Sequence, residues 1–190
     1  MFERFEEAVK FATEQHSGQL RKMHEIPYIL HPLEVASIIS TITNDEDLLI
    51  AGLLHDTIED CQTDPMLIKE KFGTRVLALV SAESEDKMSD RPPEETWRER
   101  KEDSLLFLEH CENDDVKVLW LADKLANMRS FYREYLVKGE KLWLALNQKD
   151  PKQQYWYYST IAKLLVSLKG SAAYEEYVML LNKVFEKEIK

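Results

Sequence analysis

The chain has 190 residues, of which 44% are hydrophobic and 32% charged, with a formal net charge of −10. This balance is typical of a folded globular protein and excludes a disordered one. So acidic a chain should not bind nucleic acid polymers or anionic membranes through its overall field. A metal or a local basic cluster can still attract a small anion.

The cysteines and the apolar segments indicate a cytoplasmic protein. Only two cysteines occur, without CxxC spacing, and they suggest no disulfide framework. The first ten residues have an acidic amphipathic pattern, unlike a signal peptide. No apolar stretch approaches the roughly 20 residues that span a bilayer, so we expect no membrane association.

Apolar residues recur at helical spacing along most of the chain. The pattern predicts one helix near the start, a second that begins at Pro32, and a third that is capped by Asn44 or Asp45 and runs through His55 and Asp56. Further helices are predicted around residues 65–72, 74–83, 94–110, 114–137, 153–169 and 172–188, with loops at 17–30 and 84–93. The sequence therefore predicts a single all-α domain over residues 1–190, with about eight to ten helices.

His55 and Asp56 lie within an apolar segment, AGLLHDTIED, that should be largely buried. An ionised aspartate buried without a partner is costly, and a metal ion would satisfy both side chains. A His-Asp pair is common by composition alone, so the interpretation depends on context. His31 lies directly before Pro32, and Asp123 interrupts another apolar stretch, VLWLADKLANM.

Each of the outer residues also has a simpler explanation. His31 alone could be a capping or core histidine, and Asp123 alone could pair with Arg129 or Lys124. All the simpler explanations would have to hold together, which favours a metal site. Two imidazoles and two carboxylates suit Mn²⁺, Fe²⁺, Co²⁺, Zn²⁺ or Ni²⁺.

Glu59 and Asp60 follow His55 and Asp56 by four residues and so share a helix flank with them. Taken alone, they are most simply solvated residues at a helix end. Beside an octahedral ion with four protein ligands, two positions would remain for water and a substrate oxygen, as hydrolysis requires. The pattern therefore indicates a metal-dependent hydrolase.

The ordered motifs resemble the hydrolase domain of RelA/SpoT-type alarmone enzymes. The similar segments are HSGQLRK and IPYILHPLEVA at 16–22 and 26–36, AGLLHDTIED at 51–60, WRERK at 97–101 and LADKLANMR at 121–129. The resemblance is closest to the stand-alone small alarmone hydrolases, because 190 residues leave no room for a synthetase domain. It implies an all-helical HD-domain fold and a Mn²⁺-dependent enzyme that removes the 3′-pyrophosphate of (p)ppGpp.

The resemblance also assigns roles to particular residues. It implies a metal held by His31, His55, Asp56 and Asp123, a catalytic pair Glu59 and Asp60, and substrate contacts from Arg21, Lys22, Asn127 and Ser130. Family members usually have threonine at the position of Ser130. For Arg21 and Lys22 the alternative is a solvated loop pair. The segments at 97–101 and 155–158 could supply phosphate or base contacts, but a charged helix face and a core cluster explain them more simply.

Met23, His24 and Glu25 depart from the small, glycine-containing segment of many relatives, and residues 84–87 follow the family only loosely. These departures leave the metal set intact but keep other substrates open, such as an adenosine alarmone or NADPH. A non-catalytic nucleotide-binding module is a third hypothesis. The expected partner is a small phosphorylated nucleotide, and exposed aromatic side chains would permit a homodimer.

Overall fold

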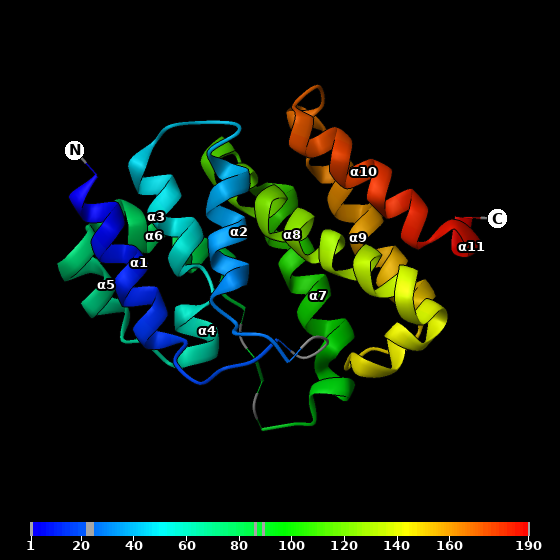
Figure 1. The fold of residues 1–190 in the computed structure, drawn as a ribbon. Coiled ribbons are helices and arrows are strands. Elements are labelled where there is room, and N and C mark those ends of the chain that lie inside the picture. The colour runs from blue at the N-terminus through cyan, green and yellow to red at the C-terminus, as the bar shows by residue number, and fades with distance from the viewer. Residues whose placement is uncertain (1, 22–24, 86, 89, 190) are drawn as a thin grey trace. The chain divides into compact units, whose positions relative to one another are not determined.

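The computed structural model describes residues 2–21, 25–85, 87–88 and 90–189 (Figure 1). In these ranges the regular structure is helical, and extended pairing is limited to one bridge between Leu20 and Pro27. The all-α prediction is confirmed. None of the described helices combines the length and apolar character that a membrane span requires.

The chain divides into two compact units, residues 1–84 with 113–123, and residues 85–112 with 124–190. The first unit contains α1 (Glu3–Gln15), α2 (Leu30–Ile39), α3 (Glu46–Leu54), α4 (Thr57–Cys61), α5 (Pro65–Phe72), α6 (Thr74–Glu83) and the first part of α8 (Asp114–Lys138). Helix α3 packs against α1, α2 and α6. Its apolar residues other than half-buried Leu49 are buried, as expected of a helix at the centre of a core.

The predicted start of the third helix is confirmed at Asp45, whose carboxylate accepts a hydrogen bond from the Leu48 amide at 3.0 Å. The predicted start at Pro32 is two residues late. Helix α2 begins at Leu30, because the amide of His31 already donates to the Tyr28 carbonyl at 2.9 Å. Pro32 fits the first turn, where amide hydrogens have no partner inside the helix.

The helix predicted to continue through residues 55–56 is interrupted there, so this part of the prediction is wrong. Helix α3 ends at Leu54 and α4 begins at Thr57. The Thr57 hydroxyl donates to the Leu54 carbonyl at 2.7 Å, and Nδ1 of His55 lies 2.9 Å from the Gly52 carbonyl oxygen. These side chains take carbonyls that a continuing helix would bond to its own amides.

The second unit contains α7 (Pro93–His110), the rest of α8, η1 (Gly139–Ala145), α9 (Pro151–Leu164), η2 (Val166–Leu168), α10 (Ala172–Val184) and α11 (Glu186–Ile189). Helix α9 packs against α7 and α10. Tyr157 and Tyr158 are buried in an aromatic core, as the simpler explanation of that run predicts. In the 97–101 segment, Arg100 is buried and forms an ion pair with Glu85.

Gly52 allows α2 and α3 to pack closely. A Cβ atom added at Gly52 would lie 2.6 Å from Cδ1 of Ile39, a side chain that is itself fully buried. Because the dense core leaves Ile39 little room to move, this overlap should outweigh the roughly 1 kcal/mol that alanine gains over glycine in a helix. We expect Gly52→Ala to lower the free energy of unfolding by about 1 kcal/mol in urea denaturation.

Ile39→Val is the control for this prediction, because it removes the Cδ1 atom. Alone it should cost about 1 kcal/mol, whereas in the Gly52→Ala background it should cost less or stabilise the protein. Strictly additive effects, or no loss of stability in Gly52→Ala, would contradict the close approach.

Candidate metal centre

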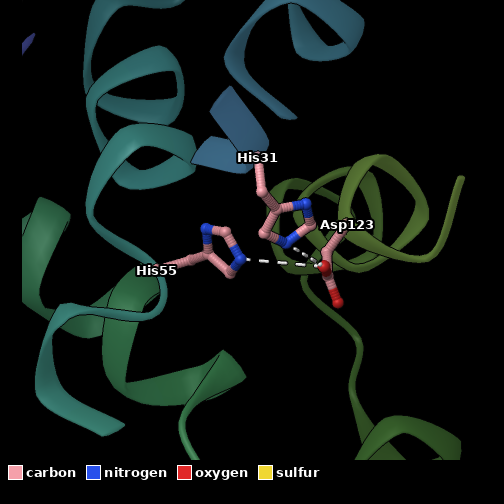
Figure 2. A group of neighbouring side chains, drawn as sticks. All are labelled: His31, His55 and Asp123. Atoms are coloured by element: carbon pink, nitrogen blue, oxygen red, sulfur yellow. Dashed lines mark ion pairs between the residues drawn. The ribbon is translucent and has the colours of Figure 1, made fainter. Parts of the chain in front are cut away.

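Four predicted residues of the first unit meet in one cluster. His31 comes from the first turn of α2, His55 and Asp56 from the junction between α3 and α4, and Asp123 from α8. Figure 2 shows the two imidazole rings turned toward the Asp123 carboxylate. The cluster brings together side chains that lie far apart in the sequence.

The distances within the cluster are short. Nε2 of His31 lies 3.0 Å from Oδ1 of Asp123 and 3.6 Å from Oδ2 of Asp56. Nε2 of His55 lies 3.0 Å from Oδ2 of Asp56 and 3.7 Å from Oδ1 of Asp123. Adjacent ligands of an octahedral ion with bonds of about 2.1 Å lie about 3.0 Å apart. The ligand atoms of His31, His55 and Asp123 lie close enough together to hold one ion, and Asp56 lies beside the two histidines.

Burial and charge control the protonation of the cluster. Burial lowers the pKa of His31 below its usual value. Burial also acts to lower the pKa of His55, but the negative charge of Asp56 and contacts with Asp123 outweigh it and raise this pKa well above its usual value. The pKa of Asp56 is lowered, because the positive charge of His55 outweighs the effect of burial.

The donor atoms also fit a metal ion. Nδ1 of His55 lies within hydrogen-bond distance of the Gly52 carbonyl, which orients the ring and directs Nε2 toward the carboxylates. This Nε2 atom is buried and is aligned with no hydrogen-bond partner among the described residues. A divalent cation would satisfy that nitrogen together with the carboxylates.

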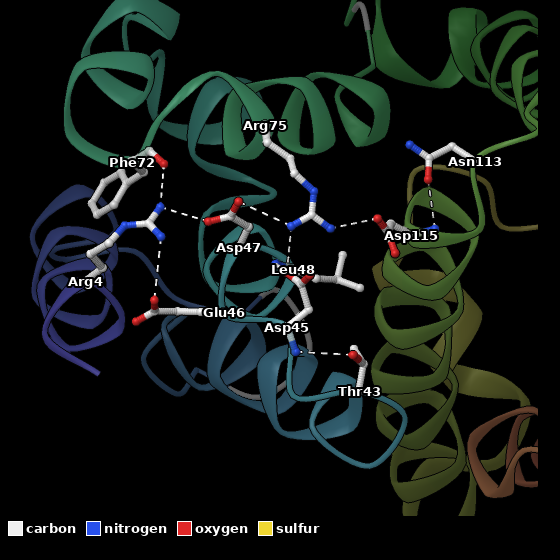
Figure 3. A network of polar contacts seen from close by, with 10 residues as sticks. All are labelled: Arg4, Thr43, Asp45, Glu46, Asp47, Leu48, Phe72, Arg75, Asn113 and Asp115. Carbon is white, nitrogen blue, oxygen red and sulfur yellow. Dashed lines mark hydrogen bonds and ion pairs between the residues drawn. The ribbon is translucent and has the colours of Figure 1, made fainter. Parts of the chain in front are cut away.

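A network of ion pairs links α3, which ends directly before His55, to α8, which carries Asp123 (Figure 3). The Arg75 guanidinium on α6 binds Asp45 at the start of α3 and Asp115 at the start of α8, each at 2.8 Å. It also lies 3.2 Å from Asp47, which pairs with Arg4 of α1 at 2.8 Å. The network is solvent-exposed, so its value here is geometric more than energetic.

Helix α4 places Glu59 and Asp60 next to the cluster in sequence, and both side chains are partly exposed. The amide of Asp60 donates to the Asp56 carbonyl at 2.7 Å, so the two residues remain one turn apart despite the interruption. Nε2 of Gln19 donates to the Asp60 carbonyl at 3.2 Å. The backbone of Asp60 is thus connected both to Asp56 and to the loop after α1.

The loop after α1 holds one predicted substrate contact, Arg21, and a residue that the sequence analysis did not assign, Tyr28. The Arg21 side chain is partly exposed, and its guanidinium carbon lies 5.5 Å from the centre of the Tyr28 ring. The Tyr28 hydroxyl donates to Oδ2 of Asp56 at 2.6 Å. Lys22 and residues 23–24 lie outside the described residues, so the prediction for Lys22 stays a prediction.

The other two predicted substrate contacts lie further along α8, in the second unit. Asn127 is partly exposed, and Ser130 is buried. Their roles also stay predictions. Arg129, which the sequence offered as a partner for Asp123, instead forms a bidentate ion pair with Glu176. Its Nε and Nη2 atoms lie 2.7 and 2.6 Å from the two carboxylate oxygens of Glu176.

A helical fold that gathers two histidines and two aspartates, with an adjacent His-Asp pair among them, defines a class of His-Asp metal-site proteins. The family profile of the HD domain matches residues 8–145, and the chain belongs to the HD-domain family. An HD domain implies a divalent metal, which agrees with the buried cluster.

Similar proteins include the guanosine-3′,5′-bis(diphosphate) 3′-pyrophosphohydrolase of Aquifex aeolicus, 38% identical over 130 residues. That match covers 68% of this chain but only 18% of the bacterial protein. The guanosine-3′,5′-bis(diphosphate) 3′-pyrophosphohydrolase MESH1 of Xenopus tropicalis is 41% identical to this chain over 131 residues. That match covers 67% of this chain and 69% of the Xenopus protein. These similarities confirm the resemblance seen in the sequence.

A solved structure described as a metazoan ortholog of SpoT that hydrolyzes ppGpp has a TM-score of 0.74 and 27% sequence identity to this chain. The match covers 97% of this chain and 95% of that structure. The likeness therefore includes the helices of both compact units.

Proposed function

We propose that the chain is a Mn²⁺-dependent hydrolase that removes the 3′-pyrophosphate of a guanosine nucleotide, converting ppGpp and water to GDP and pyrophosphate. The observation that carries the proposal is the cluster of buried His31, His55 and Asp123 with partly exposed Asp56, next to the acidic helix α4. The names of the Aquifex and Xenopus relatives support the substrate. The chain spans only 18% of the Aquifex protein, so the activity is proposed for this part alone.

The proposed roles follow from the chemistry of each side chain. His31, His55, Asp56 and Asp123 would hold the metal, Glu59 and Asp60 would handle the attacking water, and Arg21, Lys22, Asn127 and Ser130 would bind the nucleotide. A bound divalent metal supplies a more acidic water and positive charge near the phosphate. Glu59 orients the water and accepts its proton, with Asp60 assisting.

Phosphate binding must overcome the repulsion from the net negative charge of the chain. The substrate carries several negative charges, and the protein has a net charge of −10. The Arg21 guanidinium can bind a phosphate through two parallel hydrogen bonds, and Lys22 adds a compact positive charge. Together with the metal, these groups would create a local positive site. We also propose that residues 1–190 act as one hydrolase domain in the cytoplasm.

The direct test is to incubate the purified protein with ppGpp and Mn²⁺ and to identify the products. We expect GDP and pyrophosphate in equal amounts, and no turnover after chelation. Parallel reactions with Mg²⁺, Co²⁺ and Zn²⁺ test the choice of metal, and an adenosine alarmone and NADPH test the choice of nucleotide. Turnover without preference for a 3′-pyrophosphate would overturn the substrate, and nucleotide binding without any turnover would overturn the enzyme.

A further inference from the structure

We infer that Tyr28 is a positioning residue of the metal centre, whose hydroxyl holds the Asp56 carboxylate in place for metal binding. This inference rests on the proposed metal site. The hydroxyl donates to Oδ2 of Asp56 at 2.6 Å, the length of a strong hydrogen bond to a charged oxygen. The same oxygen faces Nε2 of His55 at 3.0 Å and Nε2 of His31 at 3.6 Å. Tyr28 therefore contacts the atom of Asp56 that points into the cluster.

Asp56 needs such a tether more than the other ligands do. Its side chain is 18% exposed, against 3% for His31, 1% for His55 and 6% for Asp123. Dense packing fixes buried side chains, whereas a partly exposed carboxylate can rotate into water. Asp56 also lies in the interruption between α3 and α4, outside the regular turns of either helix.

Tyr28 is itself held rigidly. Its ring packs against the ring of buried His16, with centroids 4.9 Å apart, and edge-on against His31 at 5.9 Å. Its amide donates to the Gln19 carbonyl at 2.9 Å. A donor fixed in advance loses little further freedom when it orients a ligand.

The hydroxyl is suited to donate a hydrogen bond to Asp56 without giving up its proton. Burial, followed by the negative charges of Asp56 and Asp60, raises the pKa of Tyr28 far above its usual value. A hydrogen bond from a neighbouring residue to a metal-binding carboxylate limits its rotation and commonly strengthens metal binding.

Tyr28→Phe tests the inference, because it removes the hydroxyl and keeps the ring that packs against His16 and His31. We expect Mn²⁺ to bind the metal-free variant about tenfold more weakly than the wild type in a calorimetric titration. In assays at saturating Mn²⁺, KM for ppGpp should change by less than about threefold, because the ring next to Arg21 remains. An unchanged Kd for Mn²⁺ would overturn the inference.

Tyr177→Phe is the matched control. Tyr177 is fully buried in the second unit and donates to the Tyr158 carbonyl at 2.8 Å, so the change also removes one buried tyrosine hydrogen bond. It should lower the thermal stability without changing the Kd for Mn²⁺. An equal loss of Mn²⁺ affinity in both variants would mean that Tyr28 acts only through general stability.

The titration separates this inference from the proposed function. If the wild type binds no Mn²⁺, the metal site fails and the inference fails with it. If the wild type binds Mn²⁺ and Tyr28→Phe binds it equally well, only the role of Tyr28 fails. A wild type that binds Mn²⁺ but does not hydrolyse ppGpp would leave the role of Tyr28 measurable and remove the proposed substrate.

Discussion

We expect Asp56→Asn to abolish both hydrolysis of ppGpp and stabilisation by Mn²⁺. Asparagine keeps the shape of the side chain and can still accept the hydrogen bond from Tyr28, but it lacks the charge that attracts a divalent cation. A metal contributes several kcal/mol to the stability of the transition state. Its loss corresponds to a fall in kcat/KM of at least about 1000-fold, measured with ppGpp and Mn²⁺.

Thermal unfolding provides a measurement that does not depend on turnover. A ligand at 100 times its Kd stabilises the folded state by about 2.7 kcal/mol, so Mn²⁺ should raise the Tm of the wild type but not of Asp56→Asn. Asp103→Asn makes the same chemical change at an exposed position of α7 and should retain both properties. Equal stabilisation of Asp56→Asn and wild type by Mn²⁺ would exclude Asp56 as a ligand.

The clustering of the four proposed metal ligands could be anticipated from the sequence, because the two aspartates leave a local signal. Asp56 and Asp123 interrupt apolar stretches, where a buried carboxylate needs a cation. The structure gathers both around His31 and His55, within one compact unit. The pattern of apolar residues was sufficient here because burial, not a specific contact, is what makes these charges unusual.

The interruption at residues 55–56 could not be predicted in the same way. Leu54 and Ile58 are four residues apart, so the apolar spacing continues straight through it. The break depends on hydrogen bonds from the side chains of His55 and Thr57 to backbone carbonyls. Either side chain is also compatible with a helix interior, and sequence spacing does not distinguish the two arrangements.

The contact of Tyr28 with Asp56 could not be predicted from the sequence, for a related reason. Its hydroxyl bonds to a residue 28 positions away, and no periodicity connects the two. A tyrosine three residues before His31 looks like an ordinary loop residue. The two residues meet only because the loop after α1 folds back against the start of α2. There the Tyr28 carbonyl accepts a hydrogen bond from the His31 amide.

The second large effect is expected from Glu59→Gln. Glutamine matches glutamate in size and can still hydrogen-bond a water molecule, but it cannot accept the proton of that water. We expect kcat to fall by about 100- to 10,000-fold, the usual contribution of a general base. Stabilisation by Mn²⁺ should be unchanged, because Glu59 is not among the four proposed ligands. Glu70→Gln, at an exposed position of α5, is the control and should keep full activity.

The activity of Asp60→Asn, alone and combined with Glu59→Gln, shows how the two carboxylates share the work. If the two carboxylates act as a unit on one water molecule, Glu59→Gln combined with Asp60→Asn should lose little more activity than the more damaging single change. Multiplicative losses would mean that they act in separate steps. A loss of less than tenfold in Glu59→Gln, with a large loss in Asp60→Asn, would transfer the role of base to Asp60. That residue is already anchored through its backbone to Asp56 and Gln19.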